Sequence, residues 1–246
     1  MSKIKVSCVS FLNSQPFVYG LQKFTELNKL IDLSLDVPAI CADKLMHNEV
    51  DIGLVPVATL ANMDDYEIIS NYCIGANKIV LSVLLLSNYP IKQIQHILLD
   101  DHSRTSNNLT KILAKHYWKT SPQFSFSMPE DSAYFAKVSI GDKAINERGK
   151  FKFAFDLAEE WYNFKQKKFV FACWVANKKL PEDFIQLFNK GLQFGIENIE
   201  QMINENFAYK IDNLDLKDYL ENNINYNFDK EKQESLKMYL TLMKSI

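Results

Sequence analysis

Two apolar runs constrain the fold of this chain more than any other feature. They span residues 79–86, with Ser82 inside the run, and residues 169–174. Both have the length of a β-strand, and the second is apolar on both faces, which predicts a central strand covered by helices. Neither run approaches the roughly 20 residues that a membrane span requires. We therefore expect a soluble protein with strands at its core.

Strand-like and helical segments alternate along the rest of the chain, which predicts an α/β fold. Alternating or apolar strand patterns occur around residues 4–8, 33–37, 51–56, 97–99, 124–126, 138–140 and 151–155, and helical patterns occur around 14–27, 43–48, 109–116, 156–164 and from 181 to the end. The pattern divides into two lobes, one comprising residues 1–87 and 169–246 and the other residues 88–168. The two apolar strands would carry the chain between the lobes, and a cleft between lobes is a default site for a small molecule.

Charge and cysteine usage exclude several classes of function. Lysine and arginine number 28 against 30 acidic residues, giving a net charge of −2, which excludes a nucleic-acid binder that relies on bulk positive charge. The four cysteines lack a C-x-x-C pair. Cys8 and Cys173 lie in strand-like apolar stretches and are expected to be small buried apolar residues, with a disulfide or zinc site as the alternative. The four histidines lack metal-ligand spacing, so no metal is implied. The N-terminus has no signal-peptide layout, which predicts a cytoplasmic protein that does not bind membranes.

The strongest local feature is the run of polar residues at positions 100–108, between a predicted strand and a predicted helix. Ser103, Arg104, Thr105 and Ser106 place hydroxyls and a guanidinium where free backbone N–H groups of a helix N-terminus favour an anion. The chain has only two arginines, and a forked donor suits a planar carboxylate. The alternative is that Ser103 only caps the helix and Arg104 pairs with a surface acid. His102 lies within this run, directly before Ser103.

Four further residues are candidates for the same site. Asn13 follows the first predicted strand, at the end where ligands bind open α/β sheets, or it satisfies its own turn. Ser82 lies inside an apolar strand, where its hydroxyl either faces a ligand or bonds to local backbone. Gly141 allows close backbone approach, and Asp142 either caps the next helix or contacts a substrate hydroxyl.

Six segments, taken in order, resemble one enzyme family. They are residues 10–16 (SFLNSQP), 51–57 (DIGLVPV), 82–87 (SVLLLS), 103–106 (SRTS), 141–144 (GDKA), and 156–161 (DLAEEW) together with 169–174 (FVFACW). This set resembles the chorismate dehydratases of the futalosine route to menaquinone. The sequence departs from the family pattern at residues 78–82 (KIVLS) and 165–168 (KQKK).

The resemblance implies a two-lobed fold like that of type II periplasmic binding proteins, with a helical C-terminal segment. It also implies dehydration of chorismate to 3-[(1-carboxyvinyl)oxy]benzoate without cofactor or metal. Asn13 and Ser82 are then expected nearest the reacting carbons. The remaining substrate-binding positions are expected to be Ser103, Arg104, Thr105, Ser106, Pro56, Val57, Gly141 and Asp142.

Neither Asn13 nor Ser82 is a base at neutral pH, so the hypothesis assigns proton removal to the substrate's own enolpyruvyl carboxylate, held in place by the protein. Two alternatives remain. One is the 1,4-dihydroxy-6-naphthoate synthase of the same pathway, whose family resemblance implies a histidine base that this sequence lacks at a matching place. The other is a non-catalytic solute-binding protein.

Overall fold

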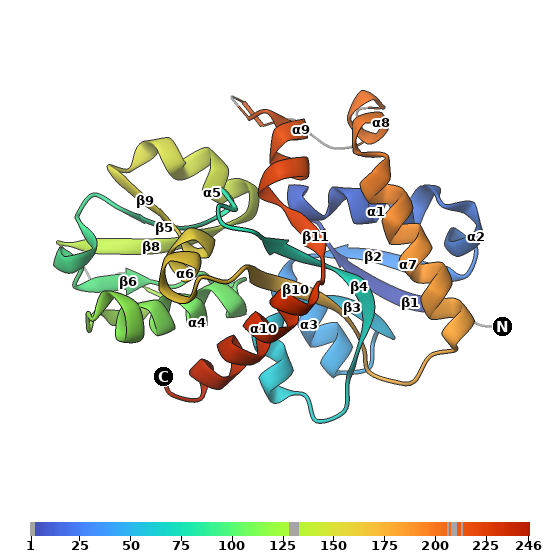
Figure 1. Ribbon diagram of the computed structural model, residues 1–246, viewed down its shortest axis with the longest axis horizontal. Coiled ribbons are helices and arrows are strands. Elements are labelled where there is room, and N and C mark those ends of the chain that lie inside the picture. Colours follow the sequence, from blue (N-terminus) through green and yellow to red (C-terminus); the bar gives the residue numbers. More distant parts are fainter. Residues whose placement is uncertain (1–2, 128–132, 206, 208–210, 213) are drawn as a thin grey trace.

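Two β-sheets lie beside each other along the long axis of the molecule, each flanked by helices (Figure 1). The computed structural model describes residues 3–127, 133–205, 207, 211–212 and 214–246. Within this part of the chain the first sheet has the order β11-β4-β10-β3-β1-β2 and the second the order β7-β6-β8-β5-β9. The first sheet comprises β1 (Ile4–Val9), β2 (Ile31–Asp36), β3 (Ile52–Pro56), β4 (Glu67–Ala76), β10 (Phe169–Ala176) and β11 (Asn225–Asn227), and the second comprises β5 (Val83–Ser87), β6 (His96–Leu98), β7 (Gln123–Ser125), β8 (Phe135–Ile140) and β9 (Phe153–Asp156).

Helices connect the strands within each lobe. Those of the first lobe are η1 (Leu12–Ser14), α1 (Gln15–Lys23), α2 (Thr25–Asn28), α3 (Pro38–Met46), η2 (Val57–Asn62), α7 (Glu182–Glu197), α8 (Ile199–Asn204), α9 (Leu216–Asp218), η6 (Tyr219–Asn223) and α10 (Lys230–Met243). Those of the second are η3 (Ile91–Gln93), α4 (Arg104–Leu113), η4 (Ala114–Trp118), α5 (Gly141–Glu147), η5 (Arg148–Lys150) and α6 (Leu157–Lys165). No described helix is long and apolar enough to cross a membrane.

The order of the first sheet places a ligand-binding edge at the ends of β1 and β3. Strand β1 pairs in parallel with β2 on one side and with β3 on the other. The connections through α1 and α3 therefore run in opposite directions along the sheet, and right-handed crossovers place these two helices on opposite faces. Ligands of open α/β sheets bind at the carboxyl ends of strands where this reversal occurs. In this chain those ends are followed by residues 10–16 and by η2.

Strand β5 explains the first apolar run and corrects its predicted position. The strand begins at Val83 rather than at residue 79, and it pairs with β8 and β9. Val83 and Leu85 belong to the main hydrophobic core, whereas Leu84 and Leu86 lie on the other face of the strand, in a small separate cluster. Both faces are therefore covered. The predicted boundary after residue 87 assigns β5 to the first lobe, whereas the strand belongs to the second sheet. An apolar run that is buried on both faces indicates a central strand, but it does not indicate the sheet to which the strand belongs.

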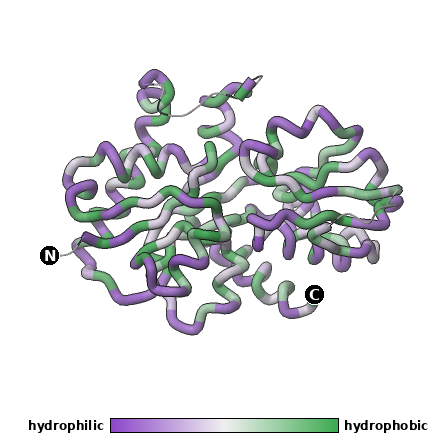
Figure 2. Tube along the Cα trace, turned by 180° about the vertical axis from the view of Figure 1, so that it is seen from behind, coloured by the Kyte–Doolittle hydropathy of each residue, from purple (hydrophilic) through white to green (hydrophobic). Residues whose placement is uncertain are grey.

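The second apolar run is a central strand, as its pattern predicts. Every residue of β10 is buried, and the strand pairs antiparallel with β3 and with β4. Figure 2 shows hydrophobic residues along the strands and hydrophilic residues in the peripheral loops. The chain after residue 181 is not helical throughout, since β11 adds an edge strand to β4. Helix α3 begins at Pro38 rather than near residue 43, because a proline is well tolerated in the first turn of a helix.

Candidate functional site

A cavity lies between the two sheets, at the carboxyl ends of strands from both. It encloses about 470 Å³, counting the open space at its mouth. One wall follows β1 and β3, and the other follows β6 and β8, which are parallel neighbours and so end at the same edge. The lining is mostly apolar, and the side chains that contribute polar atoms are Asn13, Ser103, Thr105 and Ser106. A mostly apolar pocket with a few convergent polar groups is typical of small-molecule sites.

Asn13 lies in this lining on the short turn that connects β1 to α1. Ser14 fixes the turn, because its hydroxyl donates to the carbonyl oxygens of Val9 at 2.6 Å and Phe11 at 2.8 Å. The side chain of Asn13 is 8% exposed, and its Oδ1 atom is buried without a hydrogen-bond partner among the described residues. A buried polar atom without a partner costs stability, and a hydrogen bond from a ligand in the cavity would remove that cost.

The N-terminus of α4 forms the opposite polar wall. Ser103 caps this helix, and its hydroxyl accepts a hydrogen bond from the backbone N–H of Ser106 at 3.3 Å. Both side chains line the cavity and are at most 5% exposed. The first-turn N–H groups of a helix lack intrahelical partners and favour an anion. The structure therefore shows Ser103 in the capping role of the alternative interpretation and also in the cavity wall.

Arg104 and Thr105 connect the two lobes. The Nη2 atom of Arg104 lies 2.5 Å from Oδ1 of Asp43 on α3, and Arg104 is not part of the cavity lining. Arg104 therefore pairs with a surface acid, which is the alternative that the sequence left open for this residue. Thr105 does line the cavity, but its hydroxyl donates to the carbonyl of Phe171 at 3.1 Å and accepts from the N–H of Ala58 at 3.3 Å. Both side chains therefore tie α4 to the first lobe.

Gly141 and Asp142 join the lobes on the other side of the cavity. Gly141 lines the cavity with φ of +62°, and a Cβ atom at this position would lie 2.9 Å from the ring of Phe11. Asp142 does not cap α5, whose N-cap is Ile140, and its Oδ1 instead accepts from the N–H of Leu12 at 3.1 Å. The turn that carries Asn13 is thus fastened to the second lobe.

Ser82 lies beside this wall but does not contribute to the lining. Its side chain is fully buried, and its hydroxyl donates to the carbonyl of Val80 at 3.4 Å, as the alternative interpretation has it. Its own carbonyl accepts from the N–H of Gly141 at 2.8 Å. Of the two predicted residues at the end of β3, Pro56 lines the cavity, and Val57 is buried next to it.

The segment before Ser82 is held by Asp156, the residue that directly precedes α6. Its carboxylate accepts backbone hydrogen bonds from Val80 at 3.0 Å and Leu81 at 2.8 Å, and it also caps α6. Leu81 has φ of +63°, a left-handed conformation that a branched side chain adopts at a cost. Burial raises the pKa of Asp156 to about 6, although the backbone donors act to lower it. This carboxylate therefore fixes the shape of the first crossing between the lobes.

His102 and the four cysteines lie outside the cavity lining. His102 is exposed. The four cysteines are buried and unbridged, and burial raises the pKa of the Cys41 thiol to about 12 and that of Cys73 to about 11. Such thiols are not nucleophiles at neutral pH. Among the residues that the structure describes, no group of three His, Cys, Asp or Glu side chains could hold a metal ion.

Comparison with known proteins gives one family and one fold. A family model described as menaquinone biosynthesis matches residues 4–245. No curated protein matches the chain. A solved structure of a protein of Archaeoglobus fulgidus is similar, with a TM-score of 0.75 and 16% identity over 99% of this chain and 97% of that chain. The ligand-binding component of an ABC-type import system of Staphylococcus aureus has a TM-score of 0.65 and 14% identity over 100% of this chain and 92% of that chain. The periplasmic aliphatic sulphonate binding protein of Escherichia coli has a TM-score of 0.61 and 14% identity over 100% of this chain and 87% of that chain. These likenesses confirm the predicted fold, that of periplasmic binding proteins.

Proposed function

The chain belongs to the menaquinone biosynthesis family, and from this premise we propose that it is a chorismate dehydratase, converting chorismate to 3-[(1-carboxyvinyl)oxy]benzoate and water. One observation carries the proposal: no side chain that lines the cavity is titratable, in the part of the chain that the structure describes. Chorismate loses water with aromatisation of its ring, so the reaction is downhill and needs a positioned proton acceptor rather than a strong base. A site of neutral donors suits that chemistry.

The N-terminus of α4 is the place for the ring carboxylate of the substrate. Ser103 and Ser106 face the cavity there, next to the first-turn N–H groups of the helix. The proton at C3 is acidic because the ring carboxylate is conjugated with that carbon. Donors that hold this carboxylate therefore stabilise the negative charge that develops as the proton leaves. Arg104 acts one step away, bracing the loop through Asp43.

Asn13 faces the reacting carbons from the opposite wall. Its amide orients the substrate and forms a hydrogen bond to the departing C4 hydroxyl, while the substrate's enolpyruvyl carboxylate accepts the C3 proton. The protonated enolpyruvyl carboxyl then passes this proton to the departing C4 oxygen as the C4–O bond breaks, so the products are the aromatic acid and one water molecule. The protein contributes geometry, and correct geometry accounts for a large part of a reaction barrier. Ser82 takes part directly only after its hydroxyl rotates away from the Val80 carbonyl.

The test is incubation of the purified chain with chorismate, with the aromatic product followed by absorbance and by chromatography. We expect conversion by the wild type and a loss of about 10²-fold in kcat for Asn13→Ala, as for other positioned transition-state donors. Asn62→Ala is the matched control, because Asn62 is exposed on η2 and outside the cavity lining. Ser106→Ala should raise KM for chorismate.

Three results would contradict the proposal. A wild-type chain that leaves chorismate unchanged overturns it, and conversion of a cyclic futalosine derivative to a dihydroxynaphthoate instead would favour the related synthase. Tight binding of chorismate without turnover would favour a solute-binding protein. Near-normal activity of Asn13→Ala would remove the assignment of Asn13 while leaving the reaction in place.

A further inference from the structure

The C-terminal segment of residues 225–243, which comprises β11 and α10, touches both walls of the cavity from behind. The hydroxyl of Tyr226 on β11 donates to the carbonyl oxygen of Asn13 at 3.1 Å. The hydroxyl of Tyr239 on α10 donates to the carbonyl oxygen of Thr105 at 3.0 Å. Both hydrogen bonds are buried, and they end on residues that belong to opposite lobes. One short segment therefore contacts the two polar walls of the site.

The rings of both tyrosines are fixed by aromatic neighbours. Tyr226 packs edge-to-face on Phe17 of α1, with ring centroids 5.2 Å apart. Tyr239 is fully buried and packs edge-to-face on Phe169, with ring centroids 5.3 Å apart. Because each ring has a defined place, each hydroxyl is a fixed point from which a backbone carbonyl can be positioned. Loss of either hydroxyl would leave a buried carbonyl oxygen with one donor fewer.

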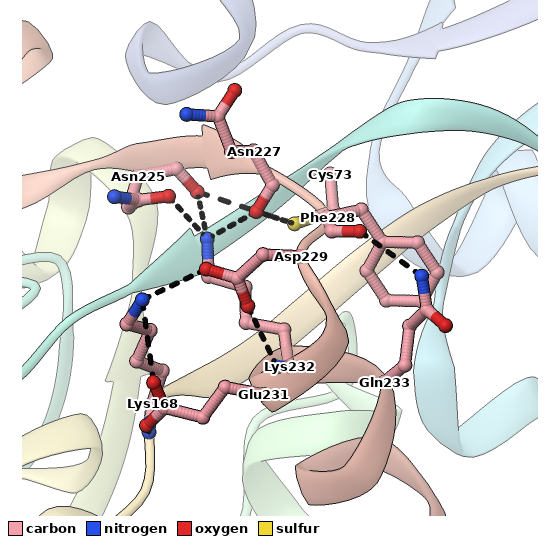
Figure 3. A network of polar contacts seen from close by, with 9 residues as sticks. All are labelled: Cys73, Lys168, Asn225, Asn227, Phe228, Asp229, Glu231, Lys232 and Gln233. Carbon is pink, nitrogen blue, oxygen red and sulfur yellow. Dashed lines mark hydrogen bonds and ion pairs between the residues drawn. The ribbon is translucent and has the colours of Figure 1, made fainter.

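A buried lysine, Lys232, holds the connection between β11 and α10, the two elements that carry these tyrosines (Figure 3). Lys232 is 0% exposed, and its ammonium donates to the carbonyl oxygens of Asn225 at 2.8 Å and Asn227 at 2.6 Å, and to Oδ1 of Asn225. Asp229 caps α10 through the N–H of Lys232 at 2.9 Å, and it also pairs with Lys168 at 2.8 Å. These bonds tie the start of α10 to β11 and to the second crossing between the lobes.

We propose that Tyr226 and Tyr239 are positioning residues of the active site, which set the places of Asn13 and of the α4 N-terminus relative to each other. Tyr226 acts through the backbone of Asn13 and so governs the chemical step. Tyr239 acts through the backbone of Thr105, in the first turn of α4, and so governs binding of the substrate carboxylate. The inference rests on the proposed dehydratase function and deepens it.

The experiment compares three phenylalanine variants with the wild type in the chorismate assay. Tyr226→Phe and Tyr239→Phe each remove one hydroxyl and keep the packed ring. Tyr19→Phe is the matched control, because Tyr19 is 1% exposed and its hydroxyl donates to Glu205 at 3.2 Å, outside the cavity lining. Thermal denaturation of all three separates loss of stability from loss of function.

The expected results divide between kcat and KM. Tyr226→Phe should lower kcat about 10-fold with KM within about twofold of the wild type, since small displacements of a catalytic group cost large factors in rate. Tyr239→Phe should raise KM about 5-fold with a smaller change in kcat. Tyr19→Phe should leave both constants within about twofold, even where its melting temperature falls as far as theirs.

Each outcome bears on the inference. An active wild type with Tyr226→Phe and Tyr239→Phe indistinguishable from Tyr19→Phe overturns the inference alone. An inactive wild type overturns the proposed function, and the inference with it. The two site variants test independent contacts, so failure of one to fold leaves the other as the test.

Discussion

Gly141 is a position at which a single methyl group should disturb both the fold and the cavity. It opens α5 with φ of +62°, where an L-residue costs about 1–2 kcal/mol more than glycine. The Cβ atom of Gly141→Ala would lie 2.9–3.1 Å from three atoms of the Phe11 ring, and overpacking of this kind costs about 1–3 kcal/mol. We therefore expect the free energy of unfolding to fall by about 2–5 kcal/mol.

The loss is measured by urea unfolding and by thermal denaturation. For a chain of this size about 2–4 °C of melting temperature corresponds to 1 kcal/mol, so Gly141→Ala should melt roughly 4–20 °C below the wild type. Because the displaced Phe11 ring lines the cavity, KM for chorismate should also rise. Gly149→Ala is the control, since a Cβ atom at Gly149 meets nothing within 4 Å and the change should stabilise by about 0.4–1 kcal/mol. Equal stabilities for the two variants would refute the reasoning.

Three further predictions concern charged side chains. The pKa of Asp156 is raised to about 6 in the folded chain from an ordinary 3.8. The stabilising contribution of this carboxyl is therefore present below pH 3.8 and lost as the pH rises through 6. Relative to Asp156→Asn, the free energy of unfolding of the wild type in urea should fall by up to about 3 kcal/mol over that interval. Asp43→Asn should cost less than about 1 kcal/mol at any salt concentration, because both partners of its pair with Arg104 are at least one-third exposed; a larger loss on melting would contradict this. Lys232→Met leaves buried oxygens without a donor and should lower the free energy of unfolding by about 2–4 kcal/mol. Lys237 is exposed on the same helix, so Lys237→Met should change that free energy by less than about 0.5 kcal/mol. Similar melting curves for the two variants would count against a buried network.

The strands that could be predicted from the sequence are those with a regular apolar pattern. Strand β10 is buried along its whole length, and β1 alternates, so both are visible in the sequence. Strand β4 escaped prediction because its pairing with β10 shifts register between Val170 and Ala172 and between Cys173 and Val175, which breaks any alternation. Strand β11 escaped because it spans three residues of which only Tyr226 is buried.

Part of the candidate site could also be predicted from the sequence, because some of its residues directly follow recognisable strands. Asn13, Ser103 and Ser106 follow strand ends, and sheet topology alone brings such residues to one edge. The scarcity of arginine drew attention to Arg104, but scarcity does not give the direction in which a side chain points. The tyrosine contacts could not be found from local patterns, since 213 residues separate Tyr226 from Asn13.

The path of the chain through the two sheets sets an order for folding during synthesis. The second sheet, from β5 to β9, is made from one uninterrupted stretch that ends at Asp156, whereas the first sheet lacks β10 and β11 until the chain has reached Asn227. At roughly 5–20 residues per second on the ribosome, several seconds separate these two points. Until β10 is complete at Ala176, β3 and β4 have no partner between them, so the nascent chain carries two open apolar edges. A chaperone that binds newly made protein would therefore meet the N-terminal half of this chain, and release it when β10 is inserted.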